Sequence, residues 1–281
     1  DCPEHKGIYP VFGRVTEGMD EILRIGSVAT EPVDFPIEGI EVNRPLEPQI
    51  IERVELDLHG VKYPEPVKVD CSTPQFEEKI RAGWVAQLVG GAMGTMVEGY
   101  TSENLQKGFG DVRTYLREPN TYNDDITFEL AFLDAFGKKG YQVTSLDVAL
   151  SWVGLIPCGW SAEELAIRNI KNGIFPPESG IYCNPFNEWI GAQMRAGICG
   201  MAAPGNPYLA ARLAWTDGEV SHANNGILGE VFNAVMTSLA FVDPDVSSIV
   251  SRAMDMIPKD SEYYSVTVSY THLTLPTILR V

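Results

Sequence analysis

The stretch NDDITFELAFLDAF, residues 123–136, decides the fold class because its apolar side chains recur with the spacing of an α-helix. Asn123 is a residue type that caps helix N-termini, and Asp124 and Asp125 would occupy the first turn. The recurring apolar positions are Ile126, Leu130 and Leu133 on one stripe, with Phe128, Phe132 and Phe136 beside it. A stripe this wide predicts a helix that is mostly buried.

Upstream of this helix, a second helix signal appears. Thr73 is placed to cap a helix that Pro74 begins, and apolar residues then recur every four positions at Ile80, Trp84 and Leu88. This pattern is typical of an amphipathic helix that packs one face against a core.

Downstream, Ser161 and Glu164 have the spacing of a capping box, and Gly173 follows the last periodic residue of that helix. The stretches NGILGEVFNAVMTSLAF and DVSSIVSRAMDMI continue the helical spacing. The sequence therefore predicts a mainly α fold, with an all-helical bundle over residues 70–264. Its long polar loops are typical of segments that carry function.

Residues 1–69 differ in character and predict a small β-rich fragment. YPVFGRVTEG alternates and ends in a Gly turn, MDEILRI is a short helical stretch, and IIERVELDL alternates as a strand. The rest of the segment is interrupted by Pro32, Pro36, Pro45, Pro48, Pro64 and Pro66. A fragment of this size is too small to bury a good core alone.

Residues 265–281, SVTVSYTHLTLPTILRV, show an abrupt change of composition toward Thr, Leu and Val. This segment resembles the translated sequencing-adapter tails found on some assembled reads. We therefore expect a non-native tail, with a genuine edge strand as the alternative. The chain also begins without an initiator Met, which suggests that it is cut there.

The charge balance narrows the classes of partner. Asp and Glu number 38 against 21 Lys and Arg, a net charge of −17, which repels nucleic acid and anionic lipid. No apolar run is long enough to span a bilayer, and no signal peptide opens the chain. The five cysteines are scattered without a CxxC pair, as in proteins with reduced thiols. We expect a cytoplasmic protein that binds neither nucleic acid nor membrane.

The segment GGAMGTMVEGY, residues 90–100, is the first of two short elements that could carry chemistry. Gly90, Gly91 and Gly94 are costly inside a helix, so they indicate a tight helix crossing or a close backbone approach to a ligand. Glu98 follows them, and its carboxylate is either simply exposed to solvent or part of a ligand-binding or catalytic site.

The second element is the start of the helix at 123–136. Asp124 and Asp125 at a helix N-terminus are stabilised as anions by the helix dipole, which is a sufficient structural role. The same arrangement keeps both carboxylates available as hard oxygen ligands for Mg²⁺. Further on, His222 in EVSHANNG is either a hydrogen-bonded structural residue or an acid–base group.

Three stretches together carry a family resemblance: GGAMGTMVE, NDDITFELAFLDAF and NEWIGAQMRAGICGMAAPGNPYLAARLAWTDGEVSHANNGILGEVFNAVMTSLAF. In order and spacing, residues 74–264 resemble the ADP-ribosylglycohydrolase family, which has an all-helical, magnesium-dependent hydrolase fold. The resemblance implies cleavage of the glycosidic bond of an ADP-ribosyl or related N- or O-ribosyl group. The implied partner is an ADP-ribose-type small molecule or an ADP-ribosylated substrate.

The resemblance also assigns roles to residues. Glu98 matches the acid that activates or orients water over the metal centre, and Asn123, Asp124 and Asp125 match the Thr-Asp-Asp metal ligands. The implied substrate-binding positions are Gly91, Asn187, Glu188, Trp189, Gly191, Met194 and His222. Gly91 stands where the family commonly has Asp, and Trp189 is a candidate for stacking on an adenine.

The family binds two Mg²⁺ ions with carboxylates from both ends of its domain. Nothing after Ala240 matches its C-terminal Asp-rich motif of the GDTDT kind. The resemblance therefore implies that this chain holds half of the metal site, and we expect it to be inactive or weakly active as it stands.

A second resemblance covers residues 1–68. YPVFGRVTEGMDEILRI followed by RPLEPQIIERVELD is similar to the C-terminal end of a cyclophilin, a β-barrel peptidyl-prolyl isomerase. The catalytic Arg of that family lies upstream of the part matched. Three hypotheses stay open: a hydrolase, an isomerase, and a non-catalytic ADP-ribose-binding module. The linkage cleaved, the oligomeric state, and whether the two parts are a natural fusion or an assembly chimera also stay open.

Overall fold

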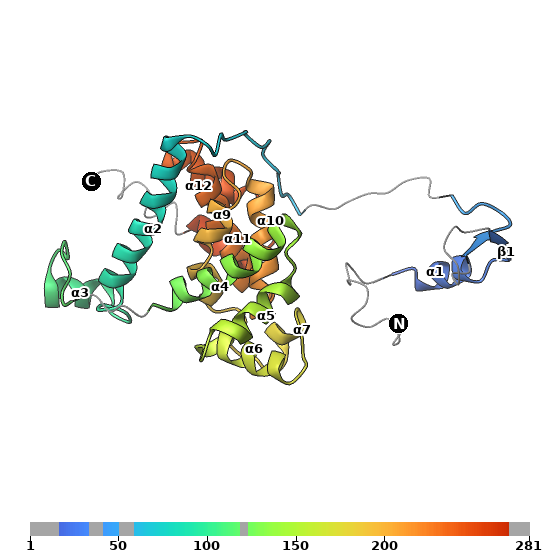
Figure 1. Cartoon of the computed structure of the whole chain (residues 1–281), viewed down its shortest axis with the longest axis horizontal. Coiled ribbons are helices and arrows are strands. Elements are labelled where there is room, and N and C mark those ends of the chain that lie inside the picture. The colour runs from blue at the N-terminus through green and yellow to red at the C-terminus, as the bar shows by residue number, and fades with distance from the viewer. Residues whose placement is uncertain (1–16, 34–41, 51–58, 119–122, 270–281) are drawn as a thin grey trace. The chain divides into compact units, whose positions relative to one another are not determined.

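The computed structural model describes residues 17–33, 42–50, 59–118 and 123–269. The chain divides into two compact units, residues 1–56 and 57–281 (Figure 1). Within the described ranges, no helix combines the length and the apolar character needed to cross a bilayer.

The first unit contains one short helix and one two-stranded ribbon among its described residues. Helix α1 (Met19–Gly26) confirms the helical prediction for MDEILRI, although none of its residues is buried. Strands β1 (Thr30–Val33) and β2 (Val42–Pro45) pair antiparallel. Both strands include a proline that the sequence had marked as a break, which a two-stranded ribbon tolerates because both of its strands are edges.

The two strands predicted in YPVFGRVTEG and IIERVELDL fall for the most part on residues 1–16 and 51–58, outside the described residues. The cyclophilin-like barrel fragment therefore stays a prediction.

The second unit is helical, which confirms the mainly α prediction. Its elements are α2 (Pro74–Gly94), α3 (Ser102–Phe109), α4 (Asp124–Lys139), the 3₁₀ turn η2 (Gly140–Gln142), α5 (Ser145–Leu155), α6 (Ser161–Lys171), α7 (Glu178–Ile181), α8 (Gly191–Met194), α9 (Gly197–Met201), α10 (Pro207–Gly218), α11 (Asn225–Leu239) and α12 (Val246–Met254). Helix α11 is central and packs against α8, α9, α10 and α12 (Figure 1). Residues 262–269 add a final helical stretch.

Helix α4 buries one of the two neighbouring apolar stripes that were expected to make it mostly buried. Phe128 and Phe132 are fully buried beside Trp152 of α5, whereas Leu130 and Leu133 are 52% and 40% exposed. The prediction that the leucine stripe is buried is wrong. The aromatic stripe lies next to it on the same helix and buries more apolar area per side chain, so it is the one that faces the core.

The predicted helix starts have mixed outcomes. The Thr73 hydroxyl accepts from the Phe76 amide at 3.3 Å and Pro74 begins α2, as predicted. The capping box at Ser161 is wrong, because the Glu164 carboxylate accepts from the Gly159 amide at 2.9 Å and the Ser161 side chain makes no capping bond. Gly173, with φ of 81°, follows the end of α6 as predicted.

Helix α2 contacts the rest of the unit along one face. The Phe76 ring lies 5.6 Å from the Phe241 ring, and a Cβ at Gly83 would lie 3.1 Å from Met201 Sδ. The Gln87 amide donates to Glu129 Oε1 at 2.6 Å. Of the predicted apolar positions, Trp84 packs against the core but Leu88 is exposed.

The last described residues continue a helix rather than an edge strand. Within the helical stretch 262–269, Tyr263, Tyr264 and Val268 pack against the core. Residues 270–281 of the expected non-native tail lie outside the described residues.

Candidate functional site

The structure brings the Gly-rich end of α2 against the start of α4. A Cβ at Gly91 would lie 2.6 Å from Asn123 Nδ2, so only glycine fits at this position without a shift. Added Cβ atoms at Gly90 and Gly94 would meet nothing within 4 Å. The tight crossing suggested by the sequence is therefore located at Gly91, and it joins two of the three stretches that carry the family resemblance.

The start of α4 presents three oxygen-bearing side chains. Asn123 Oδ1 accepts from the Ile126 amide at 3.0 Å and caps the helix. Asp124 Oδ1 accepts from the Asp125 amide at 3.2 Å, and all three side chains are half-buried. The positive end of the helix dipole favours negative charge at this position.

Negative charge accumulates around Asp125. Burial, together with the charges of Asp124 and Glu98, raises the pKa of Asp125 to about 6. Glu98 is exposed, yet it lies close enough to Asp125 for its charge to act on that carboxyl group. The structure thus gathers all of the predicted metal and water-activating residues in one region.

These residues fit Mg²⁺ in part. Carboxylate and amide oxygens are hard ligands of the kind that Mg²⁺ prefers, and a divalent cation would relieve the repulsion between the acids. In the described part of the chain, however, no three His, Cys, Asp or Glu side chains are grouped so that they could hold a metal ion. Asn123, Asp124 and Asp125 are therefore a partial ligand set.

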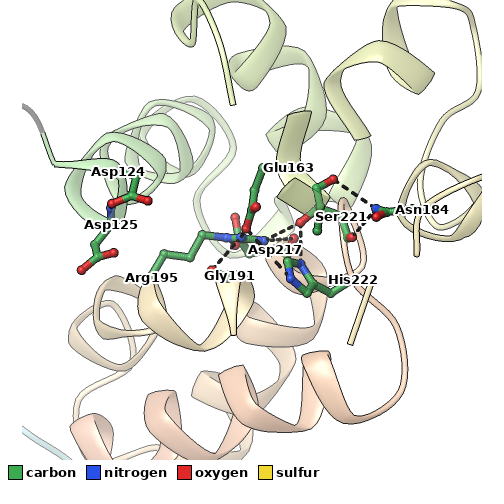
Figure 2. A network of polar contacts seen from close by, with 10 residues as sticks. Asp124, Asp125, Glu163, Asn184, Gly191, Arg195, Asp217, Ser221 and His222 are labelled. Carbon is green, nitrogen blue, oxygen red and sulfur yellow. Dashed lines mark hydrogen bonds and ion pairs between the residues drawn. The ribbon is translucent and has the colours of Figure 1, made fainter. Parts of the chain in front are cut away.

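A buried ion-pair network centred on Arg195 lies next to this region (Figure 2). Arg195 is 1% exposed, and its Nε donates to Asp217 Oδ2 at 2.5 Å. Its Nη1 donates to Glu163 Oε1 at 2.9 Å and to the Gly191 carbonyl at 3.0 Å. The guanidinium also lies 4.7 Å from the centre of the Trp152 ring. We call Arg195, Glu163, Asp217, Ser221 and His222 the Arg195 network.

The Arg195 network is electrostatically linked to the start of α4. Burial raises the pKa of Glu163, Arg195 lowers it, and the charge of Asp124 raises it again. Asp124 therefore lies close enough to Glu163 for its charge to act there. A change in the charge of Glu163 would therefore alter the electrostatic environment of Asp124, one of the candidate metal ligands.

His222 is a neutral, hydrogen-bonded member of the network. Its Nδ1 lies 2.7 Å from Ser221 Oγ, which accepts from Arg195 Nη2 at 3.1 Å. The Ser221 hydroxyl can therefore donate its proton to Nδ1 while it accepts from Arg195. Burial and then the Arg195 charge lower the pKa of His222 to about 2. His222 is therefore not an imidazolium acid at neutral pH, and these contacts favour the structural hypothesis.

The predicted substrate loop is anchored to the start of α11. The Asn187 carbonyl accepts from the Ala223 amide at 2.9 Å, and the Glu188 carboxylate accepts from Asn224 at 3.0 Å and Asn225 at 2.7 Å. Gly191 packs so closely on Glu163 that a Cβ there would overlap its carboxylate. Three of the predicted substrate positions therefore have structural contacts of their own.

Two other predicted positions differ in exposure. Trp189 is 56% exposed, and its ring packs at 4.6 Å on Phe186, so most of one aromatic surface faces solvent. Met194 is half-buried and packs against the core. Trp189 is thus available to a ligand.

The acidic partners of Arg195 and the buried side chains of Glu129 and Glu230 were not predicted from the sequence. One signal points to them: Arg195 is the only charged residue between Glu188 and Arg212, in a run of small and apolar residues. A lone charge in such a run is typical of a buried ion pair, because charged side chains are buried when they are paired.

The comparisons with known proteins add one finding. The profile of the ADP-ribosylglycohydrolase family matches residues 72–276, which include every candidate site residue described above. No curated protein and no solved structure shows significant similarity to the chain.

Proposed function

From the premise that the chain belongs to the ADP-ribosylglycohydrolase family, a family of hydrolases, we propose that its helical unit cleaves the glycosidic bond of an ADP-ribosyl or related N- or O-ribosyl group. The observation that carries this proposal is that the Gly-rich end of α2 and the start of α4 meet: Gly91 lies against Asn123, and the charge of Glu98 acts on Asp125. Both segments belong to the part of the chain that matches the family.

Asn123, Asp124 and Asp125 would hold Mg²⁺. The negative charges of Asp124 and Glu98, which add to the effect of burial on the pKa of Asp125, support this assignment, because a bound cation would offset their repulsion. When bound, the metal would supply a positive charge that orients ribose hydroxyls and water beside the anomeric carbon. The second ion that the family resemblance implies would need ligands beyond these three side chains.

Glu98 is the residue proposed to accept the proton of the attacking water. Its side chain is exposed, so water reaches it, and the effect of its charge on Asp125 supports a position close to the proposed ligands. A positioned carboxylate base contributes about 10²- to 10⁴-fold to a rate. The exposed ring of Trp189 would stack on the adenine of the substrate.

The test is the release of free ADP-ribose by the purified chain from peptides ADP-ribosylated on arginine or on serine. Product is measured by mass spectrometry with Mg²⁺ and with a chelator. Because the chain supplies only part of the ligand set, we expect slow release that depends on Mg²⁺ and that falls at least about 100-fold further in Glu98→Gln. The matched control is Glu103→Gln, an exposed glutamate of α3 that pairs with Lys107.

Release at the same rate with chelator, or from Glu98→Gln, would contradict the proposed mechanism. Mg²⁺-dependent binding of ADP-ribose without release from either linkage would favour the non-catalytic ADP-ribose-binding module. We propose no isomerase activity, because no observation on the described residues supports the cyclophilin resemblance.

A further inference from the structure

Two buried carboxyl groups face each other between α10 and α11. Asp217 and Glu230 are 1% and 0% exposed, and their carboxyl groups lie within hydrogen-bonding distance. A Cβ at Gly218 would lie 2.7 Å from Glu230 Oε2, so the glycine leaves the space that this carboxyl group fills.

Each of the two carboxyl groups has one oxygen without a partner. Among the described residues, neither Glu230 Oε2 nor Asp217 Oδ1 has a hydrogen-bond donor. The other oxygens are used: Glu230 Oε1 accepts from the Cys199 thiol at 3.9 Å, and Asp217 Oδ2 accepts from Arg195. Two facing buried carboxylates with one cation contact between them, that of Asp217 with Arg195, are costly, and one proton shared between them would satisfy both free oxygens.

The charges around Glu230 favour placing this proton on it. The titratable groups that face it are Asp217 on α10, Arg195 after α8 and Cys199 on α9. The single positive charge of Arg195 is already paired with Asp217 and Glu163. Burial and the Asp217 charge raise the pKa of Glu230 well above its ordinary value.

We propose that Glu230 is protonated in the folded protein and donates a hydrogen bond from Oε2 to Asp217, which makes it a positioning residue of the candidate site. The hydrogen bond from Glu230 fixes the Asp217 carboxylate, which accepts from Arg195. Arg195 also donates to the Gly191 carbonyl, to Glu163 and to Ser221. Glu230 thereby helps to fix the start of α8. Only the ligand-binding part of its test rests on the proposed function.

The direct test measures the protonation of Glu230. In the full chain labelled with ¹³C at glutamate carboxyl groups, NMR follows each resonance from about pH 5 to about pH 8.5, a range that lies above the ordinary pKa of glutamate. We expect one resonance to keep the shift of a protonated acid throughout and to vanish in Glu230→Gln. Glu219→Gln, which removes a half-buried glutamate of the same region, should leave it in place. A Glu230 resonance that has the shift of a carboxylate at about pH 7 overturns the proposal.

The second test compares two substitutions at the same site. Gln keeps a donor for Asp217, whereas Met fills similar space without one, so Glu230→Gln should bind ADP-ribose within about twofold of wild type and Glu230→Met at least about tenfold more weakly. Equal losses in the two variants overturn the positioning role. If Glu230→Met does not fold, the NMR comparison of wild type with Glu230→Gln still decides. Absence of hydrolase activity would leave the NMR result unchanged, so the two proposals fail separately.

Discussion

The backbone of Gly91 lies against the side chain of Asn123, so closely that a Cβ at position 91 would sit 2.6 Å from Asn123 Nδ2. This contact joins the end of α2 to the cap of α4. The first turn of α4 also carries Asp124 and Asp125. Glu98 comes shortly after α2 in the sequence, and its charge acts on Asp125. The candidate site therefore depends on how α2 crosses α4.

Gly91→Ala should destabilise the protein because the added methyl group must displace the Asn123 cap or α2. Overpacking costs about 1–3 kcal/mol, offset by up to about 1 kcal/mol from the better helix propensity of Ala. Gly90→Ala is the matched control, since its Cβ would meet nothing within 4 Å, and it should stabilise by about 0.5–1 kcal/mol. Denaturant unfolding gives both values. Equal stability of the two variants would contradict the crossing described here.

Asn123→Ala should cost about 1 kcal/mol of stability through loss of the cap and should also weaken Mg²⁺ binding. Asn206→Ala removes a cap of the same kind from α10, where Asn206 Oδ1 accepts from the Leu209 amide at 3.1 Å. We expect the same loss of stability there with unchanged Mg²⁺ affinity. Unfolding and calorimetric titration measure the two effects separately. A matching loss of Mg²⁺ affinity in both variants would argue against Asn123 as a ligand.

Helix capping was the part of the fold that the sequence predicted well, because a cap depends on neighbours three residues away. Thr73 and Asn123 both accept the amide bonds that their positions predicted. Ser161 failed because the Glu164 side chain bonds the amide of Gly159 instead. A capping box would have the Glu164 carboxylate accept from the Ser161 amide. Local spacing alone does not distinguish this amide from that of Gly159, since both lie within reach of the Glu164 side chain.

The burial of α4 and the Arg195 network could not be predicted in the same way. Two apolar stripes lie side by side on α4, and their periodicity is equal, so the choice between Phe132 and Leu133 depends on helices far along the chain. Arg195 meets Glu163 and Asp217 only after α6, α8 and α10 have packed. The predicted metal and water-activating residues were brought together, but the buried ionisable groups behind them became visible only in the structure.

Arg195→Met should be strongly destabilising because it leaves Glu163 and Asp217 as buried charges without their cation. Breaking one partner of a buried ion pair costs about 3–5 kcal/mol. Arg168→Met is the control, because its pair with Glu164 is exposed and such pairs contribute about 0–1 kcal/mol. Thermal and denaturant unfolding measure the difference. Similar losses for the two variants would contradict the burial of the network.

Glu129→Gln should remove part of the pH dependence of stability. Burial raises the pKa of Glu129 from its ordinary value of 4.5 to about 7, so the folded state binds more protons than the unfolded state between these values. Its contribution to stability is therefore present below about pH 4.5 and is lost as the pH rises to about 7, with a slope of at most about 1.4 kcal/mol per pH unit.

Unfolding free energies at several pH values measure this slope. Gln keeps the shape of the side chain that bonds Gln87 and the Ile198 amide, so Glu129→Gln should fold. The unfolding free energy of Glu129→Gln should vary less steeply with pH than that of wild type. The difference in slope should be at most that of one titrating group, about 1.4 kcal/mol per pH unit. Identical slopes would show that Glu129 is not protonated in the folded protein.

The central claim is that the start of α4 forms a metal-linked nucleotide site, and calorimetric titration of Mg²⁺ and then ADP-ribose tests it most directly. The chain is compared with Asp124→Asn/Asp125→Asn and with Glu77→Gln/Glu78→Gln, an adjacent pair of exposed acids near the start of α2. We predict Mg²⁺-dependent ADP-ribose binding in the wild type and the control, and a loss of at least about tenfold in the α4 variant, equivalent to about 1.4 kcal/mol. Equal binding by a folded α4 variant, or binding that needs no Mg²⁺, would contradict the claim.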